Sequence, residues 1–107
     1  MFYYVPIIDQ LKLLFEKNKL PSKEKYVFNS NSISDIKDGE NYKKFMSNFN
    51  LQQREFIHSF TINMDGISLS NKSPLTIWPV FLAINELPIG ERYYIDNIIF
   101  AGIYFLF

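Results

Sequence analysis

The feature that most constrains the fold is a series of strand-like segments between Phe56 and Phe105, joined by short polar turns. Side chains over Phe56–Asn63 alternate with the period of a strand, and Thr76–Ile84 is rich in β-branched and aromatic residues. Asp96–Phe105 is apolar on both faces, which indicates a central or covered strand. Pro79 cannot donate to a ladder, so we expect an edge position or a bulge there. The pattern predicts an antiparallel meander of three strands.

The amino-terminal part is different in character. An apolar stripe predicts an amphipathic helix over residues 2–19, with Pro6 in its first turn and Leu20-Pro21 at its end. Residues 21–52 are polar and predict an irregular connector, with a possible helical turn at Ser34–Asp38 and a short helix at Asn41–Asn50. The fold class is therefore α+β, with a helical and partly irregular segment over 1–52 and a sheet over 53–107.

Composition excludes several function classes. The chain has 107 residues with 11 basic and 11 acidic side chains, so it lacks the basic excess of most DNA-binding domains. Residues 1–25 hold five lysines, which fit a solvated helix face at least as well as a DNA contact. Absence of cysteine excludes disulfides and thiolate zinc sites. No secretory signal precedes the helix, and the apolar run Ile98–Phe107 is shorter than the roughly 20 residues of a membrane helix.

Asp65, followed by Gly66 at the end of the first predicted strand, is the strongest candidate for chemistry. Magnesium and manganese prefer oxygen ligands and are usually held by one or two carboxylates beside a substrate phosphate. A carboxylate on a rigid strand suits that task, and a glycine next to it lets a phosphate backbone approach. Asp-Gly is also a very common turn dipeptide, and the pattern alone favours a plain turn.

The same region resembles CACTA-type and related DDE cut-and-paste DNA transposases. The resemblance is carried by Met64–Gly66, by Ser68–Val80 with its Trp-Pro pair, and by Asn85–Pro88 and Glu91–Ile103; Tyr3–Phe15 and Ile36–Phe45 also look like segments that precede this domain. It implies the opening meander of a ribonuclease H-like fold. It also implies DNA cleavage and joining with Mg²⁺ or Mn²⁺, a DNA partner and a nuclear location. Asp65 takes the role of the first catalytic metal ligand.

The later aspartate and glutamate of such a triad have no match here. Glu86, Glu91 and Asp96 lie near the turn between the second and third strands, where solvated acids are the better interpretation. The apolar end Tyr104–Phe107 departs from the family pattern and indicates a truncated product. A single carboxylate cannot hold two catalytic metal ions. We therefore expect a transposase-derived fragment that is inactive alone and binds no metal tightly.

A non-enzymatic interaction module is the alternative, and the sequence does not separate it from a remnant without a selected role. We expect the open edge of an incomplete sheet along Ile95–Phe105, where another chain or a second copy can add a strand. Trp78 and the pair Tyr93-Tyr94 can stack on bases, but core packing for Trp78 and a half-exposed strand surface for the tyrosines are the better interpretation. His58, the only histidine, forms no zinc site without cysteine and is expected to be a strand residue without a catalytic role.

Overall fold

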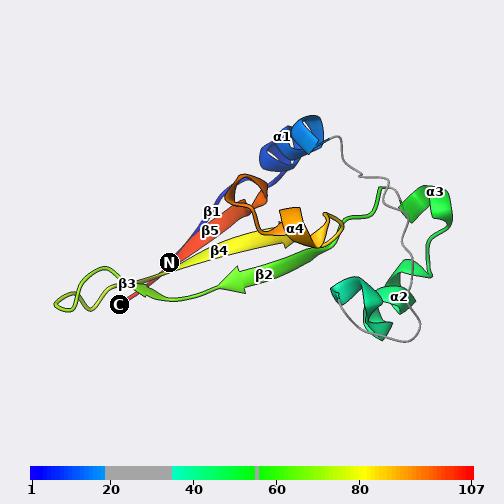
Figure 1. Cartoon of the computed structure of the whole chain (residues 1–107). Helices are drawn as coiled ribbons and strands as arrows, with labels where there is room; N and C mark the ends of the chain where they lie inside the picture. Colours follow the sequence, from blue (N-terminus) through cyan, green and yellow to red (C-terminus); the bar gives the residue numbers. More distant parts are fainter. Residues whose placement is uncertain (19–34, 55) are drawn as a thin grey trace.

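An antiparallel sheet organises the molecule (Figure 1). The structure is a computed structural model, and it describes residues 1–18, 35–54 and 56–107. The strand order is β1-β5-β4-β2, and β3 also pairs with β4. The strands are β1 (Phe2–Tyr4), β2 (Phe60–Met64), β3 (Ile67–Ser68), β4 (Thr76–Ile84) and β5 (Ile99–Leu106).

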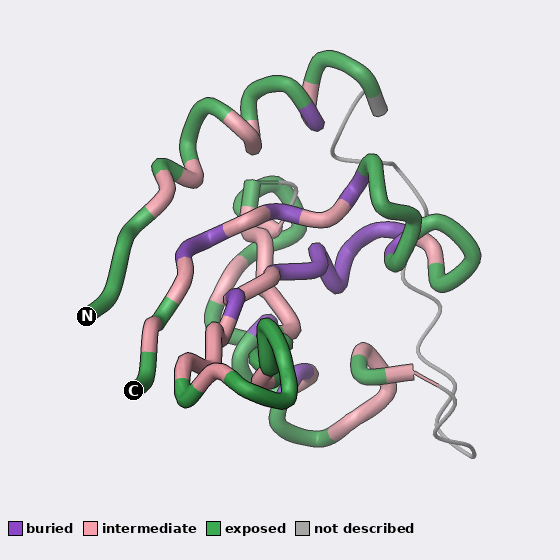
Figure 2. Tube along the Cα trace, turned by 90° about the vertical axis from the view of Figure 1, so that its left-hand side faces the viewer, coloured by how far each residue is buried: buried purple, intermediate pink, exposed green. Residues whose placement is uncertain are grey.

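The helices lie on one face of the sheet and beyond one of its ends. They are α1 (Ile8–Asn18), η1 (Ile36–Asp38), α2 (Glu40–Met46), α3 (Leu51–Arg54), α4 (Ile89–Arg92) and η2 (Ile95–Asn97). Helix α1 lies across a face of the sheet, whereas α2 and α3 lie past its end, near the start of β2 (Figures 1 and 2). The predicted α+β class is confirmed at this level of detail.

The core forms where α1 meets the sheet. Leu14 of α1 packs with a buried cluster on the strands and the following turn, and Ile7 and Leu11 pack against its margin. The cluster consists of Leu14, Leu82, Ile84, Leu87, Ile99 and Ala101. Ile84 and Ile99 are fully buried. Figure 2 shows the buried positions concentrated along β4, the turn after it and β5.

The predicted meander is present, but it belongs to a larger sheet. The second strand has the predicted bounds, while the first begins at Phe60 and the third at Ile99. The third strand is an inner strand, as expected, because β1 pairs antiparallel with it from Phe2↔Tyr104 to Tyr4↔Gly102. The predicted helix over residues 2–19 is therefore wrong at its start. Three consecutive aromatic residues favour extended backbone, and Pro6 disfavours helical geometry at Val5.

This pairing also corrects the predicted position of the open edge. The outer side of β5 is covered by β1, and the main-chain pairing extends to Met1, which accepts a hydrogen bond from the Phe105 N–H. Val5 continues it at the other end by donating to the Ala101 carbonyl. The sheet edges among the described residues are therefore β1 on one side and β2 with β3 on the other.

Gln10 joins α1 to β5 at an irregularity in the ladder. The register between β4 and β5 shifts between Val80 and Phe81, where Ala101 is the extra residue. The Gln10 side chain donates to the Phe100 carbonyl and accepts from the Phe100 N–H, both at 2.8 Å. The Gln10 amide thus satisfies the main-chain groups of Phe100, which lie beyond the end of β1. It thereby fixes the position of α1 relative to β5.

Pro79 interrupts the other side of β4. The residue pairing of β2 and β3 with β4 follows one register, from Phe60↔Ile84 to Ser68↔Thr76, but it lapses at Asp65 and Gly66. Asp65 lies opposite Pro79 in that register, and proline has no N–H to donate. Of the two expected alternatives for Pro79, the edge position is wrong, because β4 is an inner strand, whereas the β4–β5 ladder does have an irregularity close by, between Val80 and Phe81. The missing donor of Pro79 divides the partner strand into β2 and β3.

Several predictions concern the segment between α1 and β2. The helical turn after Ser34 and the short helix within Asn41–Asn50 are confirmed for their described parts by η1 and α2. The predicted helix end at Leu20-Pro21 and the first half of the connector lie outside the described residues. In η1, Asp35 caps the helix, and Asp38 accepts from the Asp35 N–H in return.

Candidate functional site

Asp65 lies exposed in the gap between β2 and β3. Its position at the end of the first strand of the meander is the predicted one. The strand is held there by its pairing with β4 up to Met64. The carboxylate is thus open to solvent on a fixed strand end, where a dissolved cation has free access.

Other acids do not converge on Asp65. Within the described ranges, no group of three or more His, Cys, Asp or Glu side chains is arranged to hold a metal ion. Glu86 hydrogen-bonds to Ser59, six residues before Asp65 along an extended chain and so about 20 Å away. Glu91 and Asp96 are exposed and lie in the segment from α4 to η2, in keeping with solvated acids. Asp65 is the one proposed ligand at this site.

Gly66 serves packing against Trp78. A Cβ atom at Gly66 would lie 2.8 Å from Cζ2 of the Trp78 ring, closer than side chains approach. The indole covers the glycine from the opposite strand, since Gly66 and Trp78 occupy facing positions in the shared register. The space beside Asp65 that the sequence suggested for a phosphate backbone is therefore occupied by an aromatic ring. Trp78 itself is half-buried.

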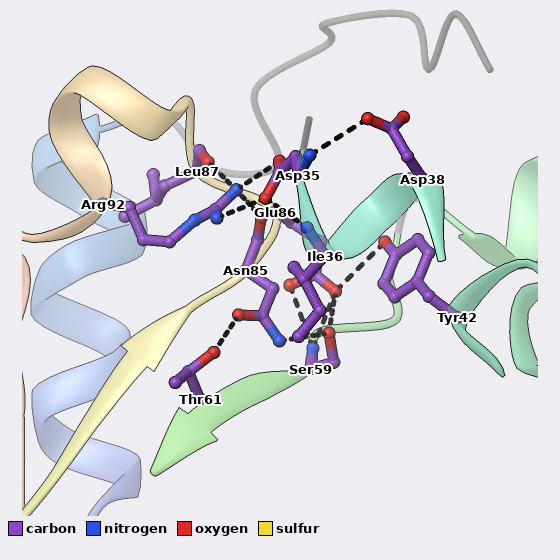
Figure 3. Close-up of polar contacts among 10 residues, drawn as sticks. All are labelled: Asp35, Ile36, Asp38, Tyr42, Ser59, Thr61, Asn85, Glu86, Leu87 and Arg92. Atoms are coloured by element: carbon purple, nitrogen blue, oxygen red, sulfur yellow. Dashed lines mark hydrogen bonds and ion pairs between the residues drawn. The ribbon is translucent and has the colours of Figure 1, made fainter. Parts of the chain in front are cut away.

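A second constellation was not predicted from the sequence. We call it the polar corner, and Figure 3 shows it where η1 and α2 meet the start of β2 and the turn after β4. Its members are Asp35, Tyr42, Ser59, Thr61, Asn85, Glu86 and Arg92.

Arg92 and Asp35 form the charged half of the polar corner. Nη1 and Nη2 of Arg92 donate to the two Asp35 carboxylate oxygens at 2.7 and 2.8 Å. The Arg92 side chain is only 3% exposed and that of Asp35 11%. The hydrogen bonds from Arg92 lower the pKa of Asp35, and burial opposes this in part. Bidentate geometry in a buried setting makes this pair stronger than a surface ion pair.

Arg92 also closes the turn that follows β4. Its Nη2 donates to the Asn85 carbonyl at 2.7 Å and to the Leu87 carbonyl at 3.1 Å. These carbonyls have left the β4 ladder and need other donors. Arg92 therefore ties three pieces of chain together: the turn, α4 and the cap of η1.

Glu86 and Asn85 form the second half of the polar corner. The Glu86 carboxylate accepts from the Ser59 N–H at 2.8 and 2.9 Å and from the Ser59 hydroxyl at 2.7 Å. The Tyr42 hydroxyl donates to it from α2 at 3.4 Å. Asn85 donates to the Ser59 hydroxyl and accepts from that of Thr61 at 2.6 Å. Glu86 is only 8% exposed, so its interpretation as a solvated acid is wrong.

A groove of about 1280 Å³ lies over the polar corner. All members of the polar corner except Glu86 line it, together with the exposed side chains of Ile36, Phe45, Ile89 and Tyr93. The Asp35 carboxylate and the Arg92 guanidinium in it already bond to each other, and Arg92 also bonds to main chain. The Ser59 hydroxyl donates to the Glu86 carboxylate and not to the neighbouring His58, whose Nδ1 has no hydrogen-bond partner among the described residues, so these residues do not form a nucleophile–base pair. The geometry of the polar corner fixes the chain rather than performing chemistry.

Other polar and aromatic residues, outside the polar corner, also have structural positions. Arg54 donates to the Met46 and Phe49 carbonyls and so closes the end of α2. Tyr93 and Tyr94 lie exposed between α4 and η2, not on a strand surface as predicted. His58 packs its ring 5.0 Å from that of Phe15, before β2 begins. Burial lowers the pKa of His58, although the nearby Glu86 acts in the opposite direction.

A signal for the polar corner exists in the sequence, but it is weak. Asp35 and Asp38 have the spacing of a capping box, and Asn85-Glu86-Leu87-Pro88 reads as a turn. Nothing in either motif indicates that the first pairs with Arg92, 57 residues away. Only the folded chain brings the two turns together.

No helix in the part of the chain that the structure describes is long and apolar enough to cross a membrane. No family model, no curated protein and no solved structure matches this chain. The resemblance to DDE transposases rests on the sequence motifs alone.

Proposed function

We propose that this chain is the opening part of a transposase-like, metal-dependent DNA cleavage domain, and that Asp65 is the one metal ligand it contributes. The observation that carries the proposal is the position of Asp65. It is an exposed carboxylate at the end of the first strand of an antiparallel meander, where the family motif requires its first ligand. The partner is DNA, the metal is Mg²⁺ or Mn²⁺, and the location is the nucleus.

The 107-residue chain is inactive on DNA by itself under this proposal. Cleavage by two metal ions needs several carboxylates within a few ångströms. Asp65 lacks such neighbours within the described residues. The chain therefore supplies a ligand to a site that needs further acids.

The experiment is to sequence the transcript beyond the codon for Phe107 and to express whatever frame continues. A frame with a later Asp and Glu must give a protein that nicks supercoiled DNA with Mn²⁺. Asp65→Asn should lower that activity at least about a hundredfold, as expected for loss of a metal ligand. Asp96→Asn, which changes another exposed acid, in η2, is the matched control and should leave the activity unchanged.

Two results oppose the proposal. Full activity of the Asp65→Asn protein removes Asp65 from the site. A stop codon directly after Phe107, together with no nicking by the purified chain, removes the catalytic role altogether.

A second candidate, a protein-interaction module, is favoured by one specific observation. The outer side of β2 has no strand partner among the described residues. A sheet edge of this kind can accept a strand from another chain. Such a partner would protect the outward-facing amides of Phe60, Ile62 and Met64 from hydrogen exchange.

A further inference from the structure

The main-chain groups at the outer side of β2 can be assigned from its pairing with β4. The Asn85 N–H donates to the Ser59 carbonyl at 3.0 Å. Hydrogen-bonded pairs alternate along an antiparallel ladder, so Thr61 and Asn63 also direct their main-chain groups toward β4. Phe60, Ile62 and Met64 therefore direct theirs outward, away from the sheet.

The usual protection of an edge strand is absent from β2. Its sequence, FTINM, contains no charged residue and no proline, the two commonest devices against strand addition. The side chains of Ile62 and Met64 are 68% and 58% exposed. The opposite edge, β1, is shorter by two residues. Edge pairing is thus most favourable along β2.

We propose that two copies of this chain pair antiparallel along β2, with Ile62 facing its own counterpart across a two-fold axis. This register sets Phe60 opposite Met64 and Thr61 opposite Asn63. The outward main-chain groups of Phe60, Ile62 and Met64 then meet one another as hydrogen-bonded pairs. The strand is self-complementary in this register, as an isologous contact requires.

The side chains support the same register. Phe60, Ile62 and Met64 share the face on which α1 lies, because they pair with Ile84, Leu82 and Val80. In the dimer they form apolar cross-strand pairs on that face, while Thr61 and Asn63 pair on the other. No like charges meet, since the strand carries none. A second copy is therefore the occupant that the edge itself specifies.

This dimer deepens the interaction candidate and does not depend on the metal-ligand proposal. The two Asp65 residues would lie three positions from the axis on either side, about 20 Å apart. Pairing along β2 therefore creates no two-metal site. A nicking assay and an association measurement test the two ideas separately.

The first test is sedimentation of the purified chain over a range of concentrations. Wild type should show a reversible monomer–dimer equilibrium. Ile62→Lys should raise the dimer dissociation constant at least about tenfold, because two ammonium groups would face each other at the axis. Leu13→Lys is the matched control, since Leu13 is 66% exposed but lies on α1, and it should leave the constant unchanged.

The second test fixes the register by cross-linking, which a chain without cysteine allows cleanly. Ile62→Cys should form a disulfide-linked dimer on mild oxidation, because facing residues of a hydrogen-bonded pair have Cα atoms about 5.5 Å apart. Met64→Cys, on the same edge, should not, since its counterpart would lie about 14 Å away. Efficient cross-linking at Met64 but not at Ile62 overturns the proposed register.

A wild-type chain that stays monomeric at about millimolar concentration overturns the dimer. If another protein nevertheless protects the amides of Phe60, Ile62 and Met64 from exchange, the edge serves a different partner. The second-copy proposal then fails while the interaction candidate survives.

Discussion

Two regions attach helical chain to the same sheet by opposite means. Under α1, Leu14 with Ile7 and Leu11 meets the apolar side chains of β4 and β5, and the uncharged Gln10 amide adds hydrogen bonds to β5. At the polar corner, η1 and α2 are joined to β2 and the turn after β4 through buried charges and hydroxyls. An apolar contact tolerates small changes of shape, whereas a buried ion pair fails when one member is lost. The corner is therefore the more sensitive region.

The largest expected effect is that of Arg92→Met. The substitution leaves the buried Asp35 carboxylate without its partner and removes the donor to the Asn85 and Leu87 carbonyls. We expect the free energy of unfolding at pH 7 to fall by about 3–5 kcal/mol. Urea denaturation measures it. The double variant Asp35→Met/Arg92→Met should lose less than Arg92→Met alone, and a greater loss in the double variant would show that the pair is not the cause.

Glu86→Gln tests the second half of the same corner, where Glu86 bonds to Ser59. The amide keeps the shape but offers only one accepting oxygen to the Ser59 N–H and hydroxyl, which now share two. We expect a loss of about 1–3 kcal/mol in the free energy of unfolding, because a buried donor is left without its acceptor. A change below about 0.5 kcal/mol would mean that water replaces the carboxylate and that the corner is less closed than its burial implies.

Ile99→Val is the matching change in the apolar region. Ile99 is fully buried, so losing one methyl group should cost about 0.5–1.5 kcal/mol in the same urea experiment. If this variant is less stable than Glu86→Gln, the apolar region and not the polar corner is the more sensitive to substitution.

The pH dependence of stability extends the comparison to His58, which His58→Phe tests. Burial lowers the pKa of His58 in the folded chain, so the unfolded chain binds the proton more readily. The stabilisation by neutral His58 is complete above its unfolded pKa of about 6.5 and is lost as pH falls through the lowered folded value. We expect wild type to melt at a lower temperature at pH 5 than at pH 7.5, and His58→Phe to show a smaller difference. An unchanged difference would assign the pH dependence to another group.

Asp35 does not interfere in that window. Its pKa is lowered by Arg92, so its contribution is complete above the ordinary carboxyl value of about 3.9 and is lost only at still lower pH. Scans between pH 5 and pH 8 therefore leave the Asp35–Arg92 pair intact, while scans below pH 4 include its loss.

Local patterns in the sequence correctly predicted those features of the fold that depend on residues close together in the chain. The β-branched and aromatic composition of Thr76–Ile84 gave both bounds of β4 correctly, and alternation and apolar runs located the other two strands of the meander. The apolar stripe located α1, with its start displaced. Asp65 was placed at a strand end because the turn chemistry follows it directly. Each of these depends on residues close in the chain, where backbone preference and side-chain period act together.

Contacts between distant residues could not be inferred in the same way. The pairing of Phe2–Tyr4 with β5 joins the two ends of the chain, and it converted a predicted helix start into a strand and a predicted open edge into a covered one. Nothing in the sequence pairs Arg92 with Asp35, yet the folded chain brings their side chains within 2.7 Å. The resemblance to transposases named Asp65 but gave no information on its neighbours.

The sequence by itself determined the α+β class, the meander and the exposed carboxylate at the end of its first strand, because the periods of strands and turns are local properties of the chain. Only the tertiary structure decided that β1 closes one edge while β2 stays open, and that buried Arg92 and Glu86 hold the corner. Those outcomes follow from desolvation. A charge or a strand edge removed from water must find a partner, and that partner can lie anywhere in the sequence.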